Sequence, residues 1–220
     1  MKATKLFNDK ATLPDGSIVE MTIWQLATAV PERPHGLKYS LYYGRAGARL
    51  VGYDNERGKG EHKHLAGREL RYRFVSVEQL VADFLADIEK FAGMNCNGRS
   101  NTMATKIQVH VDDLTAMGKR FVDAWHRAQA GESVDEAHVT FLSFQAMTET
   151  LSPRRLELLR FVRQHGAASV RELAAALGRD YKNVHQDVSA LESGGLLVRE
   201  GRRLTAPWNE VQASIKLASA

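Results

Sequence analysis

Residues 169–205, SVRELAAALGRDYKNVHQDVSALESGGLLVREGRRLT, decide the predicted fold of the C-terminal half. Ser169 and Glu172 have the spacing of a capping box that opens a short helix, and Gly178 allows a tight turn after it. A second helix follows, with its apolar residues on one face: Val184, Val188 and Leu191. The closing LLVREGRRLT predicts a hairpin with Glu200 and Gly201 at its tip. This order of elements predicts a winged helix-turn-helix.

The outward positions of this segment carry polar and basic side chains. Those at the start of the second helix are Arg179, Tyr181, Lys182, Asn183, His185 and Gln186, and those flanking the hairpin tip are Arg199, Arg202 and Arg203. Hydrogen-bonding groups on such a helix can read base edges in the major groove, and a basic wing can contact phosphate. The alternative is a helical domain whose polar face is only solvated. Five basic residues over 179–203 are nearly cancelled by four acidic ones, so we expect a homodimer to strengthen DNA binding.

The segment from Lys106 onwards resembles the MarR-like winged-helix regulators, which act as antitoxins or transcription factors. The matching phrases include KIQVHVDDL, FVDAWHRAQAGE, LSPRRLELLRFV and RELAAALGRDYKNVHQDVSALESGGLL. The resemblance implies DNA binding through the second helix and the wing, usually at the regulator's own promoter. It also implies no catalysis and no cofactor in this half.

The first half has the pattern of strands followed by one helix. Residues 17–26 alternate in polarity, and LKYSLYYG and ARLVGY follow around a glycine turn, which predicts antiparallel strands. SVEQLVADFLADIEKF then changes to helical spacing, with Ser76 as its N-cap. A sheet packed on a helix predicts an α+β domain over residues 1–92, with a mostly helical winged helix-turn-helix domain beyond it.

Composition places a boundary between the two halves. Residues 93–103, GMNCNGRSNTM, have the composition of a linker, and residues 104–220 then form the second domain, as if a second protein started at Met103. We expect the helix over 113–128 and the tail WNEVQASIKL to pack against a second copy or against the first half. The tail has Trp208, Val211 and Ile215 at helical spacing.

The whole chain has a mild basic charge and a single thiol. Its 220 residues have a net charge of +4, which permits nucleic-acid binding without requiring it. Cys96 is the one cysteine, so an intramolecular disulfide is excluded. No apolar run of about 18 residues or signal-peptide pattern occurs, which predicts a cytoplasmic protein without membrane contact.

The stretch YDNERGKGEHKH, residues 53–64, contains the candidate chemistry of the first half. If EHKH continues a strand, His62 and His64 share one face while Glu61 and Lys63 lie on the other. One imidazole can take the proton of a ribose 2′-hydroxyl and another can protonate the leaving oxygen, while cations stabilise the charged phosphorus centre. The candidate catalytic residues for this metal-independent RNA cleavage are His62, His64, Asp54, Arg57 and Lys59.

Two other interpretations of this stretch remain open. A basic hairpin that is only solvated would contain the same residue types. A metal site could use both histidines with Asp54 or Glu56, but an HxH pair needs a third ligand at a defined place, so we expect no metal ion here.

The first half also resembles the TumE-type family of small toxins, from about Lys5 to Phe91. The phrases are LPDGSIVEMTIWQL, HGLKYSLYYG, LVGYDNERGKGEHKH and YRFVSVEQLVADFLADI. Such toxins are encoded beside winged-helix antitoxins, which implies a toxin–antitoxin fusion: an endoribonuclease half restrained by a half that binds its own operator DNA and packs on it. The alternatives are a transcription factor with a non-catalytic sensory or assembly domain, and a metal-dependent nuclease.

Overall fold

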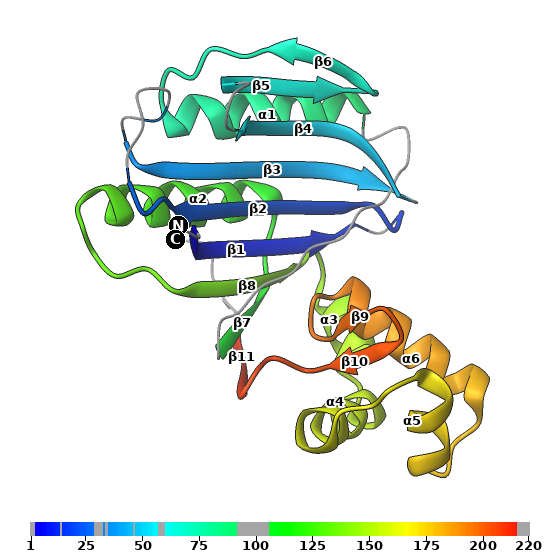
Figure 1. Ribbon diagram of the computed structural model, residues 1–220. Helices are drawn as coiled ribbons and strands as arrows, with labels where there is room; N and C mark the ends of the chain where they lie inside the picture. The colour runs from blue at the N-terminus through cyan, green and yellow to red at the C-terminus, as the bar shows by residue number, and fades with distance from the viewer. Residues whose placement is uncertain are drawn as a thin grey trace.

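The structure is a computed structural model that describes residues 3–13, 15–28, 33, 35–45, 47–56, 60–91 and 106–214. A large mixed sheet has two helices along one face, and a helical region with a small hairpin lies at one end of the sheet (Figure 1). This is an α+β protein, as predicted. None of the helices in the described part of the chain has the length and apolar character needed to cross a membrane.

The first half forms the predicted meander and closing helix. Its elements are β1 (Thr4–Thr12), β2 (Ile18–Gln25), β3 (Leu37–Arg45), β4 (Ala48–Glu56), β5 (Gly60–Leu65), β6 (Arg68–Arg71) and α1 (Val77–Phe91). Each strand pairs antiparallel with the next. The N-terminus of α1 is capped as predicted, because Ser76 Oγ accepts a hydrogen bond from the backbone N–H of Gln79.

The second half alternates strands and helices before its hairpin. Its elements are β7 (Lys106–Val111), α2 (Leu114–Gln129), β8 (Glu136–Phe141), α3 (Phe144–Thr150), α4 (Pro153–His165), α5 (Val170–Ala176), α6 (Tyr181–Ser193), β9 (Val198–Glu200), β10 (Arg203–Thr205) and β11 (Glu210–Ser214). The predicted short helix and second helix are confirmed as α5 and α6, with the tight turn between them. The predicted hairpin is confirmed as β9 and β10. Gly178 and Gly201 have φ values of 61° and 63°, which favour glycine.

One nine-stranded sheet joins the two halves, in the order β11-β7-β8-β1-β2-β3-β4-β5-β6. Strand β8 pairs parallel with β1, the edge strand of the meander, and β7 and β11 continue the parallel part. The C-terminal half is therefore less helical than predicted. The predicted linker at 93–103 lies outside the described residues, as do Cys96 and Met103, so the boundary stays a prediction.

The tail at 208–217 was predicted to be a helix, and this prediction is wrong. Residues Glu210–Ser214 form β11, which pairs parallel with β7. The edge of β7 offers backbone hydrogen bonds that an isolated helix of this length would not outweigh. Trp208 and Val211 do pack in the hydrophobic core of the C-terminal half, with residues such as Ile107 and Leu197, and Ile215 lies outside the described residues.

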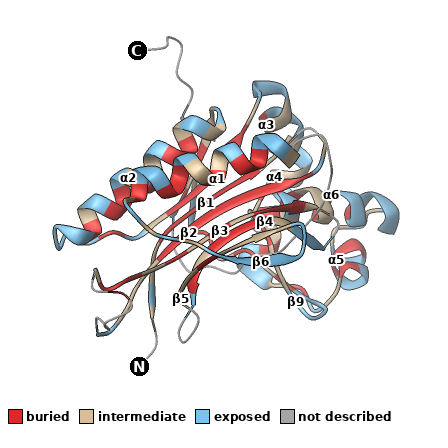
Figure 2. Cartoon of the chain, turned by 90° about the horizontal axis from the view of Figure 1, so that it is seen from above, coloured by how far each residue is buried: buried red, intermediate tan, exposed pale blue. Residues whose placement is uncertain are grey.

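Helices α1 and α2 cover the same face of the sheet, and their buried sides point toward it (Figure 2). Although α2 connects β7 to β8, it contacts β1 and β2 of the first half. Met117, Phe121 and Trp125 of α2 are buried in one core with Phe7 and Tyr39 of the meander. The first half therefore completes its core with a helix from the second half.

Candidate functional site

The second face of the sheet, opposite α1 and α2, carries the candidate residues of the first half. Tyr53 and Lys63 are a cross-strand pair on the helix side, where both contact Asp87 of α1. Their neighbours Asp54, His62 and His64 consequently face the other way. The prediction that the two histidines share a face opposite Lys63 is confirmed.

Three side chains converge on this open face. His62 Nε2 lies 3.0 Å from Asp54 Oδ1, and His64 Nε2 lies 4.0 Å from Asp54 Oδ2. The two imidazole rings have centroids 5.1 Å apart and meet edge to face. Asp54 and His62 are direct cross-strand partners in β4 and β5, so the paired backbone fixes their spacing. We call Asp54, His62 and His64 the Asp–His–His cluster.

Access to the cluster decreases from His64 to His62. The side chains of His64 and Asp54 are 20% and 17% exposed, whereas that of His62 is 5% exposed. Burial, followed by the charge of Arg49, lowers the pKa of His64 below its ordinary value. His64 is therefore neutral at neutral pH and reachable from solvent, the state in which an imidazole can accept a proton.

A second hydrogen bond fixes the tautomer of His62. His62 Nδ1 lies 3.0 Å from the backbone carbonyl oxygen of Gly60, which can only accept, so Nδ1 carries a proton. The opposite nitrogen, Nε2, faces the carboxylate of Asp54. Two lone pairs cannot face each other at this distance, so the contact needs a cation between or on these groups: a proton on Nε2 or a metal ion.

Arg49 is a member of the site that the sequence did not reveal. Its Nη1 lies 3.4 Å from Asp54 Oδ2, and its side chain crosses Gly52, where an added Cβ would come within 2.5 Å of Arg49 Cδ. The register shifts in β4 next to Arg49, so simple alternation would place Arg49 and Asp54 on opposite faces. The sequence signal that could have revealed Arg49 is Gly52, two residues before Asp54, which leaves room for the arginine side chain.

The remaining candidates of this stretch have different positions. Asn55 is buried and hydrogen-bonds the backbone of β3, and Glu56 is exposed. Arg57 and Lys59 lie outside the described residues, so their predicted phosphate contacts stay predictions.

The helix side of the same strands is held by a charged network. Lys63 Nζ donates to Asp87 Oδ2 at 2.8 Å and to Tyr53 Oη at 3.1 Å. These hydrogen bonds, with one from Lys90, outweigh the burial of Asp87 and hold its pKa at about 2. The network ties β4 and β5 to α1 and so fixes the strands that carry the cluster.

The open face also carries an aromatic ring between cations. Lys5 Nζ and Lys38 Nζ lie 5.5 Å and 5.1 Å from the ring centre of Trp24, and Trp24 is half-buried. Lys38 is two residues before Ser40, the cross-strand partner of Asp54. Trp24 and its lysines therefore share the cluster's face, at a distance of about 10–15 Å by strand geometry.

The predicted DNA-reading helix α6 is exposed along one face. Tyr181, Lys182, Asn183, His185 and Gln186 are all exposed. Asp180 caps the helix by accepting from the backbone N–H of Asn183. These five side chains thus have the exposure that their predicted role needs.

The predicted basic residues around α6 divide into two groups. Arg179 makes an ion pair with Asp187, and Arg199 donates two hydrogen bonds to Glu192, at 2.7 Å and 2.8 Å. Arg202 and Arg203 are exposed beside the hairpin tip. The charge available to a phosphate is therefore carried by Lys182, Arg202 and Arg203 more than by the paired arginines.

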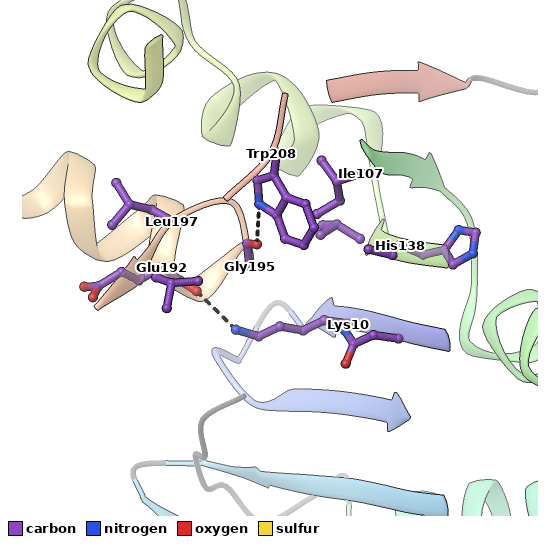
Figure 3. Close-up of a pocket in the computed structure, with 11 residues that line it drawn as sticks. Lys10, Ile107, His138, Glu192, Gly195, Leu197 and Trp208 are labelled. Atoms are coloured by element: carbon purple, nitrogen blue, oxygen red, sulfur yellow. Dashed lines mark hydrogen bonds between the residues drawn. The ribbon is translucent and has the colours of Figure 1, made fainter. Parts of the chain in front are cut away.

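The C-terminal end of α6 contacts β1 of the first half (Figure 3). Lys10 Nζ donates to the carbonyl oxygen of Glu192 at 3.1 Å, and Thr12 Oγ1 donates to that of Ser193 at 3.0 Å. The cavity beside this contact has a volume of about 40 Å³, room for only one or two water molecules. This place is an interface between the halves and no pocket for a substrate.

A buried ion pair crosses the same junction on the other face of β1. Asp9 is completely buried and accepts hydrogen bonds from Arg120 of α2 at 2.8 Å and from Thr140 of β8 at 2.9 Å. A buried carboxylate without such partners is costly, so the second half supplies charge compensation that the first half lacks.

Comparison with known families matches two separate parts of the chain. Residues 3–92 match the family described as Toxin TumE, and residues 150–213 match the family described as HVO_A0114. No curated protein and no solved structure matches the chain. The resemblance of the first half to the TumE-type toxins is thereby confirmed. The second family is HVO_A0114, and no match to MarR was found beside it.

Proposed function

Because residues 3–92 are a TumE toxin domain and residues 150–213 are an HVO_A0114 domain, we propose that the chain is a toxin–antitoxin fusion. The first half cleaves RNA without a metal ion, and the second half binds operator DNA and restrains the first. The observation that carries this proposal is the convergence of Asp54, His62 and His64 on the open face of the toxin domain.

The cluster has the groups that transesterification of RNA needs. His64 Nε2 takes the proton of a ribose 2′-hydroxyl, and the 2′-oxygen attacks the adjacent phosphorus. The bond from phosphorus to the 5′-oxygen breaks, and His62, whose Nε2 lies 3.0 Å from Asp54 Oδ1, acts as the general acid and donates a proton to that oxygen. The products are a 2′,3′-cyclic phosphate and a 5′-hydroxyl. Arg49, beside Asp54, stabilises the negative charge that grows on the phosphate oxygens.

Features of the same face support an RNA substrate. Bases stack on aromatic side chains, and cations contact the backbone of single-stranded RNA. Trp24 with Lys5 and Lys38 offers both on the cluster's side of the sheet. A single strand lying across β2, β3 and β4 would reach from Trp24 to His64.

The proposed DNA-binding unit is a winged helix of the MarR-like kind. Helix α6 enters the major groove with Asn183 and Gln186 toward the bases, and the β9–β10 hairpin contacts phosphate through Arg202 and Arg203. The exposure of these side chains supports this arrangement. Since two of the nearby arginines are paired with acidic residues, we propose that a homodimer provides the remaining affinity.

We place the restraint of the toxin at the junction near Lys10. Lys10, Glu20, Tyr42, Gly52 and His64 form one cross-strand row, so α6 adjoins the row that ends at the cluster. The cluster on β5 lies about 24 Å from β8, five strand spacings away. Helix α6 contacts this face at Lys10, so we propose that the second half restrains the toxin by obstructing RNA there.

Separate expression of the two halves tests the proposal. Residues 1–92 and residues 104–220 are placed under independent promoters in the same cells. Residues 1–92 alone should stop growth and deplete RNA, and residues 104–220 supplied in trans should restore growth. The matched control is residues 1–92 carrying His64→Gln, with the soluble amount of both versions measured.

The outcomes separate the toxin from its rivals. Healthy cells that contain soluble residues 1–92 would favour a non-catalytic sensory or assembly domain. Arrest that persists with His64→Gln would reject the cluster as the reactive site. Operator binding by residues 104–220 in a gel-shift assay is measured independently, since toxin activity and DNA binding can fail separately.

A further inference from the structure

The Asp–His–His cluster presents three ligand atoms to one point. One imidazole nitrogen from each of His62 and His64 and one carboxylate oxygen of Asp54 all lie within 4.8 Å of one another. Among the residues that the structure describes, this is the one such group of histidine, cysteine, aspartate and glutamate side chains. A sequence pattern of HxH lacks a third ligand, and strand β4 supplies it through the register of Asp54 with His62.

His62 also makes the hydrogen bond that orients a metal-binding histidine. Histidines that bind metals usually donate their other ring N–H to a carbonyl or carboxylate, which orients the lone pair. His62 Nδ1 donates to the carbonyl of Gly60 at 3.0 Å, so the free electron pair of a neutral His62 is at Nε2. That nitrogen lies 3.0 Å from Asp54 Oδ1, so the two atoms can share one cation.

The ligand types select among cations. Two imidazoles and one carboxylate with an open fourth position form a common set in catalytic-type zinc sites. Magnesium and calcium prefer oxygen ligands and would gain little from the two imidazoles. The side chains of His64 and Asp54 are partly exposed, so a fourth position at the cluster can be open to solvent. Arg49 opposes binding, since its guanidinium lies 3.4 Å from Asp54 Oδ2.

We propose that Asp54, His62 and His64 bind one zinc ion, and that the bound ion switches the cluster off. The second part rests on the proposed function: a ligated imidazole has no lone pair for a proton and no proton to donate. Zinc and RNA cleavage therefore compete for the same nitrogen atoms. The site has an inhibitory role that a metal-dependent nuclease would lack.

Zinc binding to the intact chain tests the site without relying on activity. Competition against a chromophoric zinc chelator should give one zinc per chain. Asp54→Asn and His64→Gln should each weaken zinc at least about 100-fold, because even outer-shell partners are worth about 10- to 100-fold. Magnesium at the same concentrations should not compete. Folding of each variant is checked by circular dichroism, and these two partly exposed positions are chosen since His62 is more deeply buried.

His126→Gln is the matched control. His126 Nε2 lies 2.6 Å from Glu78 Oε1, so it forms a histidine–carboxylate pair, and no third ligand joins it among the residues that the structure describes. This variant should bind zinc as the parent does. Absence of zinc binding by the parent, or equal binding by the parent and the two cluster variants, would overturn the site.

The consequence for cleavage is measured on toxin half released from the intact chain at a protease site inserted within residues 93–103, because the intact chain is proposed to be restrained. The released half is compared zinc-free and zinc-loaded, with its folding checked by circular dichroism. Activity without zinc that falls on loading and returns with chelator supports the inhibitory role. Activity that appears only on loading would overturn that role, and with it the metal-independent function, while the binding site itself would stand. Zinc binding with no RNA cleavage under either condition would reject the proposed function and the inhibitory role together, and leave the site.

Discussion

Two histidine pairs lie in this molecule with nearly the same spacing and different hydrogen-bond partners. His62 and His64 have ring centroids 5.1 Å apart on the open face, and His110 and His138 have centroids 5.2 Å apart at the junction of the halves. Each pair has one buried histidine, His62 or His138, and one partly buried histidine, His64 or His110. Spacing alone therefore does not distinguish a reactive pair from a structural one.

The hydrogen bonds explain the difference. At the junction, His138 Nε2 donates to Glu136 at 3.2 Å and its Nδ1 accepts from His110 Nε2 at 3.0 Å, so both nitrogens of His138 are satisfied without an added proton. Burial, with the charge of Arg120 next, lowers the pKa of His110 to about 4, which keeps it neutral. On the open face, the lone pairs instead converge on one carboxylate. In the proposed function, that pair is the one that exchanges protons with a substrate.

The largest expected effect comes from removing either histidine of the pair on the open face. His62→Ala and His64→Ala should each reduce RNA cleavage by residues 1–92 by about 10² to 10⁴, the usual effect of removing a general acid or base. Lys63→Ala should reduce cleavage less, because Lys63 contacts Asp87 on the opposite face. Initial rates on a single-stranded RNA, with folding checked by circular dichroism, provide the measurement. A greater loss from Lys63→Ala than from either histidine change would contradict the assignment of faces.

The next largest effect comes from removing the buried ion pair at the junction of the halves. Arg120→Met should destabilise the intact chain by about 3–5 kcal/mol, since it leaves the carboxylate of Asp9 buried without its cation. Adding Asp9→Asn should recover much of this loss, because a neutral amide costs less to bury. The free energy of unfolding in urea measures both. A loss under about 1 kcal/mol for Arg120→Met would show that the ion pair does not hold the halves together.

A smaller effect concerns the two ends of α6, one at the junction and the other exposed. Asn183→Ala and Gln186→Ala should each weaken operator binding by roughly 1–3 kcal/mol and relax sequence preference. Arg202→Ala and Arg203→Ala should weaken binding to all sequences and flatten its salt dependence. Gel-shift titrations at several salt concentrations separate these patterns. Unchanged operator affinity for Asn183→Ala would reject α6 as the reading helix.

The smallest expected effect is the pH dependence of stability that arises from Glu136, the hydrogen-bond partner of His138 at the junction. The hydrogen bond from His138, together with that from Arg127, outweighs burial, which raises the pKa, and holds the pKa of Glu136 at about 2, below its ordinary value of 4.5. A lowered pKa means that this carboxylate stabilises the fold above about pH 4.5 and loses that effect as pH falls toward 2. Urea unfolding should show Glu136→Gln less stable than the parent at pH 6, with the difference shrinking below pH 4.5. A constant difference would contradict the hydrogen-bonded carboxylate.

Local patterns in the sequence predicted the features that depend on neighbouring residues. The strand period placed His62 and His64 on one face, and capping residues such as Ser169 marked where helices begin. These features need only the backbone geometry of a few residues.

The joining of the two halves depends on residues far apart in the chain. β1 offers an edge, and nothing in its own residues says that β8 will pair with it more than a hundred positions later. Asp9 and Arg120 belong to segments that look self-sufficient when read separately. The tail was misjudged for the same reason, since β11 becomes a strand only because the edge of β7 is available. Arg49 reaches Asp54 through a local register shift that strict alternation does not allow.

The chemical ends of cleaved RNA test the central claim most directly. Toxin half released from the intact chain, at a protease site inserted within residues 93–103, is incubated with RNA in the presence of a metal chelator. We predict products with 2′,3′-cyclic phosphate and 5′-hydroxyl ends, because the 2′-oxygen is the nucleophile and the two histidines move the protons. The same ends should be missing with His64→Gln. Cleavage that requires an added metal ion and leaves 3′-hydroxyl ends would contradict the account.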